Sequence, residues 1–163
     1  MERTKEKKLE KIVVNIGLGK LRDKPHFEDK ILPEIVKEIS IITGQKPSIV
    51  PAKKSIAGFK VREGEVVGLK TTLRGKRMID FFSKIINTTL PRVRDFRGLN
   101  KSIVDHSGSL NIGFKDKQVF PEVDSDKSKI DFGLQVTVVP KERDRDDALE
   151  IYKEMGVPFK KEE

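Results

Sequence analysis

The order of apolar and polar residues along the chain predicts a mixture of strands and helices. Strict alternation, typical of half-buried strands, occurs over residues 12–18, 66–73, 109–114 and 130–139. Apolar residues at helical spacing predict helices over residues 30–43, 76–90 and 144–155. Gly44 is expected to cap the first helix, Pro91 to stop the second, and Asp144 to start the third. The remaining segments are expected to be an extended piece over 46–51, a loop over 52–65, and a polar connection over 115–129 with an extended stretch at 119–121.

Each predicted strand has one apolar face, which predicts a two-layer α+β fold. A mostly antiparallel sheet would carry helices on one face and leave the other face open. We call the residues expected on the open side the polar face: Asn15, Gly17, Lys70, Thr72, Asn111, Gly113, Asp131, Gly133, Gln135 and Thr137. Glycine weakens a strand unless another backbone must come close. The polar face is therefore interpreted as the contact surface for a rigid partner, the alternative being that its glycines mark bulges or twist.

Length and composition bound the possible functions. A chain of 163 residues suits a single domain, taken as residues 1–163. The absence of cysteine excludes disulfides, a cysteine nucleophile and iron–sulfur clusters, and only His26 and His106 are available as histidine ligands. The apolar runs are too short to span a membrane, and the charged N-terminus does not have the pattern of a signal peptide. We expect a cytoplasmic protein without metal, cofactor or membrane-spanning segment.

The positive charge is concentrated in the middle of the sequence. The net charge of the chain is +8, with +2 in residues 1–45, +10 in residues 46–101 and −4 in residues 102–163. A localised basic block of this kind indicates a partner with many negative charges. At this point RNA, DNA and an anionic membrane remain open, as does a basic surface without a partner.

Motifs for catalysis or nucleotide binding are incomplete. The glycines of Asn15–Lys20 resemble a dinucleotide-binding turn, but Arg22 stands where the third glycine would be. No phosphate-binding loop with the GxxxxGK[ST] pattern occurs. The residue types of a hydrolase triad are present in Ser102, Asp105 and His106. The sequence around them supplies neither a nucleophile elbow nor an oxyanion hole, so they do not indicate a catalytic site. We expect no enzyme and no small-molecule substrate, and a small hydrolase stays as the alternative from another class.

The 52–65 loop combines cations, glycines and an aromatic side chain. Lys53, Lys54, Lys60 and Arg62 can meet phosphates, and glycines let a backbone approach an RNA surface. Phe59 could stack on a base or pack back on the domain. The loop has no apolar period, so we expect it to protrude and to move on the nanosecond timescale. An ordinary flexible hairpin loop is the alternative.

Several long motifs resemble one known family. They occur in a fixed order at residues 44–47, 52–64, 68–78, 91–99, 119–124 and 157–160. Over about residues 10–161 the chain resembles the large-subunit ribosomal protein L-five family, in its bacterial form. The resemblance implies a two-layer α+β fold, binding to 5S rRNA in the central protuberance, and a loop that reaches the peptidyl-site tRNA. It also implies large-subunit rRNA and neighbouring ribosomal proteins as partners, and no membrane.

The resemblance and the basic block together give the candidate site residues. Family residues that meet 5S rRNA map onto Asn15, Gln45, Thr72 and Arg74. The polar face and the basic block add further rRNA-binding candidates: Gly17, Lys46, Lys53, Lys54, Lys70, Arg92 and Arg94. The loop implied to contact tRNA consists of Ser55, Ile56, Ala57, Gly58, Phe59, Lys60, Val61, Arg62, Glu63 and Gly64. No metal ligand and no catalytic residue are expected.

One departure and one alternative accompany the resemblance. Bacterial members of the family commonly begin with an extra helix, whereas here only a short charged extension, residues 1–10, precedes the first predicted strand. A free-standing RNA chaperone or translation regulator could use the same RNA-binding surface as a ribosomal protein. The polar face carries no exposed aromatic pair, so base stacking in the manner of an RRM is not expected there.

Overall fold

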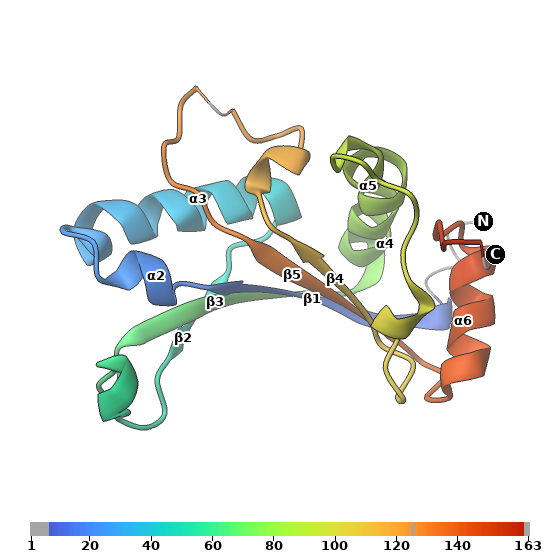
Figure 1. The fold of residues 1–163 in the computed structure, drawn as a ribbon, viewed down its shortest axis with the longest axis horizontal. Coiled ribbons are helices and arrows are strands. Elements are labelled where there is room, and N and C mark those ends of the chain that lie inside the picture. Colours follow the sequence, from blue (N-terminus) through green and yellow to red (C-terminus); the bar gives the residue numbers. More distant parts are fainter. Residues whose placement is uncertain (1–6, 125, 162–163) are drawn as a thin grey trace.

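The computed structural model describes residues 7–124 and 126–161, and it is built around one antiparallel sheet (Figure 1). The strands are β1 (Leu9–Gly17), β2 (Ser48–Pro51), β3 (Val66–Leu73), β4 (Leu110–Phe114) and β5 (Leu134–Pro140). Their order across the sheet is β2-β3-β1-β5-β4, and every neighbouring pair is antiparallel. The first strand of the chain therefore lies at the centre of the sheet.

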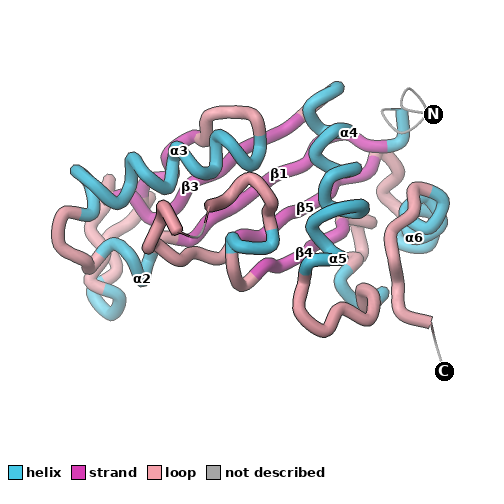
Figure 2. The backbone as a smooth tube through the Cα atoms, turned by 90° about the horizontal axis from the view of Figure 1, so that it is seen from above, coloured by secondary structure: helices cyan, strands magenta, loops and turns pink. Residues whose placement is uncertain are grey.

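The longer helices lie mainly on one face of this sheet. They are α3 (Leu32–Thr43), α4 (Gly75–Lys84) and α6 (Arg145–Glu154), with short helices α2 (Gly19–Arg22) and α5 (Leu90–Arg92). Helices α3 and α4 cover the same face, while α6 lies against the end of the sheet that is remote from α2 (Figures 1 and 2). Helices packed on one face of an antiparallel sheet confirm the predicted α+β class.

Apolar side chains from the two layers form a single core. The inward positions of β1, such as Ile12 and Val14, are fully buried, and so are Ile35 and Ile39 on the facing side of α3. Gly44 caps α3 in the left-handed conformation, with φ +73°, because glycine lacks the Cβ that would clash there. No helix in the described part of the chain is long and apolar enough to cross a membrane.

Several predicted boundaries shift in the structure. The strand predicted over 130–139 begins only at Leu134, so Asp131 and Gly133 lie before it rather than in the sheet. The first strand begins at Leu9, which shortens the predicted charged extension, whose residues 1–6 lie outside the described part. The helical path predicted over 76–90 passes Pro91 and ends at Arg92, because a π-helical turn (Ile85–Thr89) leaves Pro91 in the first turn of α5, where proline is tolerated.

The connection over 115–129 differs from the prediction in two ways: it contains a 3-10 turn and a buried lysine. Residues Lys117–Val119 form a 3-10 turn, so Val119 is not extended. The Lys117 side chain is 1% exposed, and its ammonium lies 2.8 Å from the Glu38 carboxylate and donates to Ser128 Oγ at 2.7 Å. It also lies 5.2 Å from the centre of the Phe132 ring. These contacts tie the connection to α3 and compensate the buried charge.

Candidate nucleic-acid interface

The register of the sheet places the polar side chains of different strands in a row. Ser48 pairs with Lys70, Lys70 with Asn15, Asn15 with Gln135, and Gln135 with Gly113. All five residues are exposed on the side away from α3 and α4. The row crosses the whole sheet from β2 to β4, and all of its residues except Ser48 belong to the polar face predicted from the sequence.

A second row runs parallel to the first. Thr72 pairs with Val13, Val13 with Thr137, and Thr137 with Asn111, and all four are partly exposed. The Thr137 hydroxyl donates to Asn111 Oδ1 at 2.9 Å, so these two side chains hold each other in place. No side-chain hydrogen bond to another described residue is recorded for Asn15 or for the Thr72 hydroxyl. Their polar groups remain available to a partner.

The glycines of the polar face occupy their positions for different structural reasons. A Cβ added to Gly17 or Gly113 would meet no atom within 4 Å, so the space above both residues is open. A Cβ added to Gly133 would lie 3.0 Å from the Phe114 carbonyl oxygen. Gly133 is therefore required by the close approach of two segments of the chain itself. The hypothesis that a glycine leaves space for a partner therefore applies only to Gly17 and Gly113.

At the end of β3 that leads into α4, one predicted RNA-binding side chain, Gln45, also stabilises the fold. Gln45 Nε2 donates to the Thr72 carbonyl oxygen at 3.0 Å and joins the residue after α3's cap to β3. Its Oε1 accepts a long hydrogen bond from Arg77 at 3.5 Å. Lys46 and Arg74 are exposed beside it, and Arg74 immediately precedes α4. Gln45 thus holds the end of β3 in position, while Lys46 and Arg74 are exposed to a partner.

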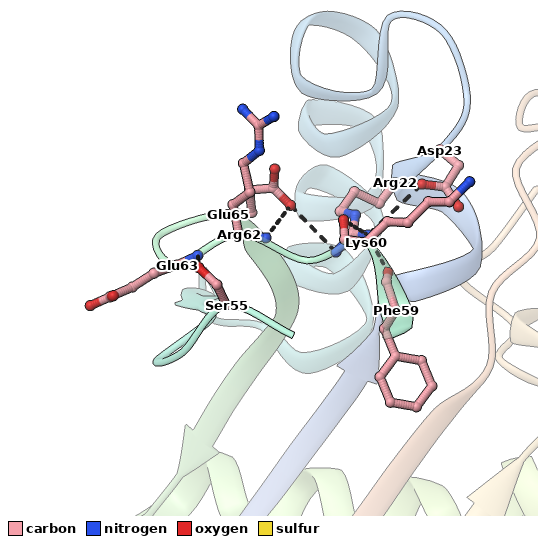
Figure 3. Close-up of polar contacts among 8 residues, drawn as sticks. All are labelled: Arg22, Asp23, Ser55, Phe59, Lys60, Arg62, Glu63 and Glu65. Carbon is pink, nitrogen blue, oxygen red and sulfur yellow. Dashed lines mark hydrogen bonds and ion pairs between the residues drawn. The ribbon is translucent and has the colours of Figure 1, made fainter. Parts of the chain in front are cut away.

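Arg22 anchors the 52–65 loop, a role that the sequence did not reveal. Its guanidinium donates to the carbonyl oxygens of Phe59 and Lys60 at 3.2 and 3.0 Å, and it lies 3.6 Å from the Glu65 carboxylate (Figure 3). The Arg22 side chain is only 12% exposed. The contact joins residues 37 and 38 positions apart, so no local pattern could have predicted it.

The loop also has an internal scaffold. Ile56 and Val61 exchange two backbone hydrogen bonds, of 2.8 and 3.1 Å, and the Ser55 hydroxyl accepts from the Glu63 amide at 2.9 Å. The 3-10 turn Ala57–Phe59 forms the tip. Phe59 is 75% exposed, so it does not pack back on the domain. We now expect a protruding loop with an ordered base, whereas the nanosecond mobility predicted from its composition stays a prediction.

Two comparisons with known proteins decide the family. The profile described as Ribosomal protein L5 matches residues 4–62, and the profile for the C-terminus of the same ribosomal protein family matches residues 66–159. The large ribosomal subunit protein uL5 of Syntrophomonas wolfei is 48% identical over 153 residues, which are 94% of this chain and 84% of that protein. Its counterpart in Halothermothrix orenii is 46% identical over 152 residues, 93% of this chain and 83% of that protein. The chain belongs to the ribosomal protein L5 family.

Membership of the L5 family confirms the resemblance found in the sequence. It makes the chain a structural, rRNA-binding protein of the large ribosomal subunit and places it with the ribosome in the cytoplasm. A family of structural ribosomal proteins is not a family of enzymes. The hypothesis of a free-standing RNA chaperone or regulator gains no support from these relatives.

The carboxylate of the hypothetical hydrolase triad, Asp105, has other partners. The Asp105 carboxylate accepts hydrogen bonds from the Ser107 amide and hydroxyl and from the Ser109 amide, and it shapes a tight turn. Burial alone would raise the pKa of Asp105, but these hydrogen bonds outweigh it and hold the pKa below its ordinary value. No hydrogen bond between Asp105 and His106 is recorded. No group of three or more potential metal ligands occurs among the described residues.

The structure does not gather all predicted rRNA-binding residues of this L5-family chain on one surface. Lys53 and Lys54 are exposed where the 52–65 loop leaves β2. Arg92 ends α5 and Arg94 follows it, so both belong to the helix layer rather than to the polar face. The basic block is contiguous in the sequence, but the chain crosses from one layer to the other within it. The predicted set therefore divides into a group on or beside the sheet, the two loop lysines, and the two arginines at the end of α5 and just after it.

Proposed function

We propose that this chain binds 5S rRNA through the polar face of its sheet and helps to hold that RNA in the central protuberance of the large subunit. The observation that carries the proposal is the pair of polar rows that crosses the sheet on the side free of α3 and α4. The identity of the RNA comes from the family resemblance. Neighbouring ribosomal proteins and large-subunit rRNA are the further partners expected in that place.

Recognition through this face would combine hydrogen bonds with phosphate neutralisation. Asn15 and the Thr72 hydroxyl have polar atoms available, and Lys70 pairs with Asn15 in the first row. Lys46 and Arg74 add positive charge near the end of β3 that leads into α4. Phosphate contacts position an RNA, and contacts to base or sugar edges give specificity. No aromatic residue belongs to the two rows, so the proposed mode is hydrogen bonding to an RNA surface of fixed shape.

We also propose that the 52–65 loop contacts the peptidyl-site tRNA. The loop protrudes from one end of the molecule, and Phe59, Lys60 and Arg62 are exposed on it (Figures 1 and 3). An exposed ring beside two cations is suited to an RNA surface, since bases stack on aromatic side chains and cations meet phosphates. The separation of the loop from the polar face would let the chain hold 5S rRNA and touch tRNA at the same time.

The proposal is tested by binding to isolated 5S rRNA and to an unrelated RNA of equal length over a salt series. We expect selective binding of 5S rRNA that weakens with salt, because counterions are released on phosphate contact. Asn15→Ala and Thr72→Ala should each weaken binding by about 1–3 kcal/mol, the cost of leaving a partner unsatisfied. Both variants should keep the wild-type Tm. Wild-type affinity in both variants would remove the polar face from the proposal, and absence from sedimented ribosomes would favour the free-standing regulator.

A further inference from the structure

An open groove of about 1060 Å³ lies between the segment after α5 and the C-terminal tail. The two segments that form it lie at the end of the molecule that carries α6, opposite the 52–65 loop (Figures 1 and 2). Phe96, Arg97 and Gly98 line one side, and residues 158–161 line the other. We call it the C-terminal groove. Neither row of the polar face contributes to it.

The two sides of the C-terminal groove are joined by backbone hydrogen bonds. The Leu99 amide donates to the Pro158 carbonyl oxygen at 2.7 Å, and the Lys160 amide donates to the Leu99 carbonyl oxygen at 2.9 Å. Gly98 has φ +100°, and a Cβ there would lie 2.9 Å from the Lys160 nitrogen. The close pairing therefore requires glycine at position 98. The groove is a defined feature of the fold, formed by two segments that are distant in the sequence.

The side chains of the C-terminal groove are positive and aromatic. Arg97, Lys160 and Lys161 are exposed, and none of the described residues that line the groove carries a carboxylate. Among the described residues, no ion pair or side-chain hydrogen bond is recorded for these three cations. Phe96 and Phe159 are partly buried against the core but still line the groove. Rings held in place beside unpaired cations offer stacking surfaces and phosphate contacts together.

The basic segment that leads into the groove adds to its positive charge. Arg92 and Arg94 are exposed just before Phe96, and Asp95 is the one acidic residue between positions 91 and 98. These arginines contribute to the positive charge of the middle block but lie away from the polar face. They extend the positive surface of the groove along the chain toward α5.

We propose that the C-terminal groove binds an unpaired stretch of RNA, as a second contact independent of the polar face. Phosphates would lie on Arg97, Lys160 and Lys161, and a base would stack on the accessible part of Phe96 or Phe159. Proteins that bind single-stranded RNA combine a positive groove with aromatic stacking in this way. A paired helix keeps its bases stacked internally and offers none to these rings. The chemistry therefore favours an unpaired segment of rRNA over a duplex.

Crosslinking in assembled large subunits tests what occupies the groove. A photo-reactive residue in place of Lys161 should give adducts with RNA, at nucleotides that are unpaired in the subunit. The same residue in place of Ile41, which is exposed on α3 away from these cations, is the control and should give no RNA adduct. Adducts with protein alone, or none at the Lys161 position, would overturn the proposal.

Binding of a labelled decauridylate to the full-length protein gives the second test. Removing two phosphate contacts with Arg97→Gln and Lys160→Gln should reduce the salt slope of log K by about 1.4, since each contact to a single strand contributes about 0.7. Lys24→Gln with Lys129→Gln removes the same charge at exposed positions elsewhere and should leave the slope unchanged. An equal decrease of the salt slope in both double variants would mean that the RNA responds only to the overall surface charge, and it would refute the groove as a binding site.

The stacking part of the proposal is tested separately from charge and from the polar face. Phe159→Leu keeps an apolar side chain against the core, and we expect it to weaken decauridylate binding about fivefold or more without loss of fold. A duplex RNA of the same charge should not respond to this change, and an equal response would contradict stacking. A Gly17→Val variant, which obstructs the polar face, should keep decauridylate binding. Its 5S rRNA affinity reports independently on the proposed function.

Discussion

The polar face and the 52–65 loop are both expected to meet RNA, but different forces hold them in place. The polar face is fixed by the hydrogen-bond ladders of five strands, so its side chains are spaced by the sheet register. The tip of the loop depends on one backbone pair, Ile56 with Val61, and on the guanidinium of Arg22. A surface built on a ladder tolerates the loss of one contact better than a tip with few anchors.

This difference separates two ways of meeting a partner. A rigid face suits an RNA that stays bound, because no ordering of the protein opposes binding. A protruding tip with few anchors suits a partner that arrives and leaves during translation. The predictions below change one region at a time and use the other as the control.

The largest effect is expected when the same bulk is added to each region. Gly17 and Gly58 have open space where a Cβ would be built, and neither has a positive φ, so Gly17→Val and Gly58→Val should both fold. On the rigid face the added side chain would push the RNA away at a cost of about 1–3 kcal/mol. Gly17→Val should therefore lower 5S rRNA affinity about five- to hundredfold, while Gly58→Val should leave it unchanged.

Binding isotherms for both valine variants, with Tm as the check on folding, decide the comparison. Valine favours strand structure, so the Tm of Gly17→Val should not fall. Equal affinity losses in the two variants would mean that the loop also contacts 5S rRNA. Equal wild-type affinities would remove the polar face from RNA binding.

Much of the polar face could be predicted from the sequence, because alternation is a local property. Asn15, Thr72 and Gln135 lie where the period-two pattern placed them, on the side away from the buried residues. The glycine pattern misled at Gly133, which is needed for a close approach within the chain. The alternating pattern of a strand depends on neighbours in the sequence, whereas the space above a glycine depends on segments that are distant in the sequence.

The anchors of the loop and of the connection over 115–129 could not be predicted for the same reason. Arg22 and Lys117 are ordinary cations in the sequence, and each finds its partners through the fold. Lys117 meets Glu38, 79 positions away, and becomes one of the most buried residues of the chain. A charge of this kind resembles a solvated surface residue until the tertiary structure brings a counter-ion to it.

Shortening the tip of the loop should affect tRNA more than 5S rRNA. Ile56 and Val61 already face each other as a hydrogen-bonded pair, so residues 57–60 can be replaced by the two-residue turn Asn-Gly. This removes exposed Phe59, whose stacking on a base would contribute about 1–3 kcal/mol. Ribosomes with the shortened chain should retain peptidyl-site tRNA less well, in a filter-binding or dissociation assay. Unchanged retention together with reduced 5S rRNA affinity would reverse the proposed division of roles.

A smaller effect should distinguish the lysines of the two regions by salt dependence. Lys70 lies in the first row of the polar face, and Lys60 lies at the tip of the loop. Lys70→Gln should reduce the salt slope of 5S rRNA binding by about 0.7–0.9, the contribution of one phosphate contact. Lys60→Gln removes the same charge and should leave that slope unchanged. Affinities measured from low to moderate salt give both slopes, and a decrease for Lys60→Gln would place the loop on 5S rRNA.

The smallest effect on 5S rRNA binding, and the most specific one on the loop, is expected at Arg22. Its guanidinium bridges two carbonyl oxygens and a carboxylate, a geometry that the single ammonium of lysine cannot reproduce. Arg22→Lys should therefore keep the charge but loosen the tip. NMR order parameters for residues 57–60 should fall from about 0.85 toward about 0.6, while those of β1 and β3 stay constant. Asp23→Asn is the matched control, because Asp23 is highly exposed and lies 3.9 Å from Arg22 without touching the loop carbonyls. If Arg22→Lys leaves the tip as ordered as in the wild type, the pairing of Ile56 with Val61 is sufficient to hold it, and Arg22 is not its anchor.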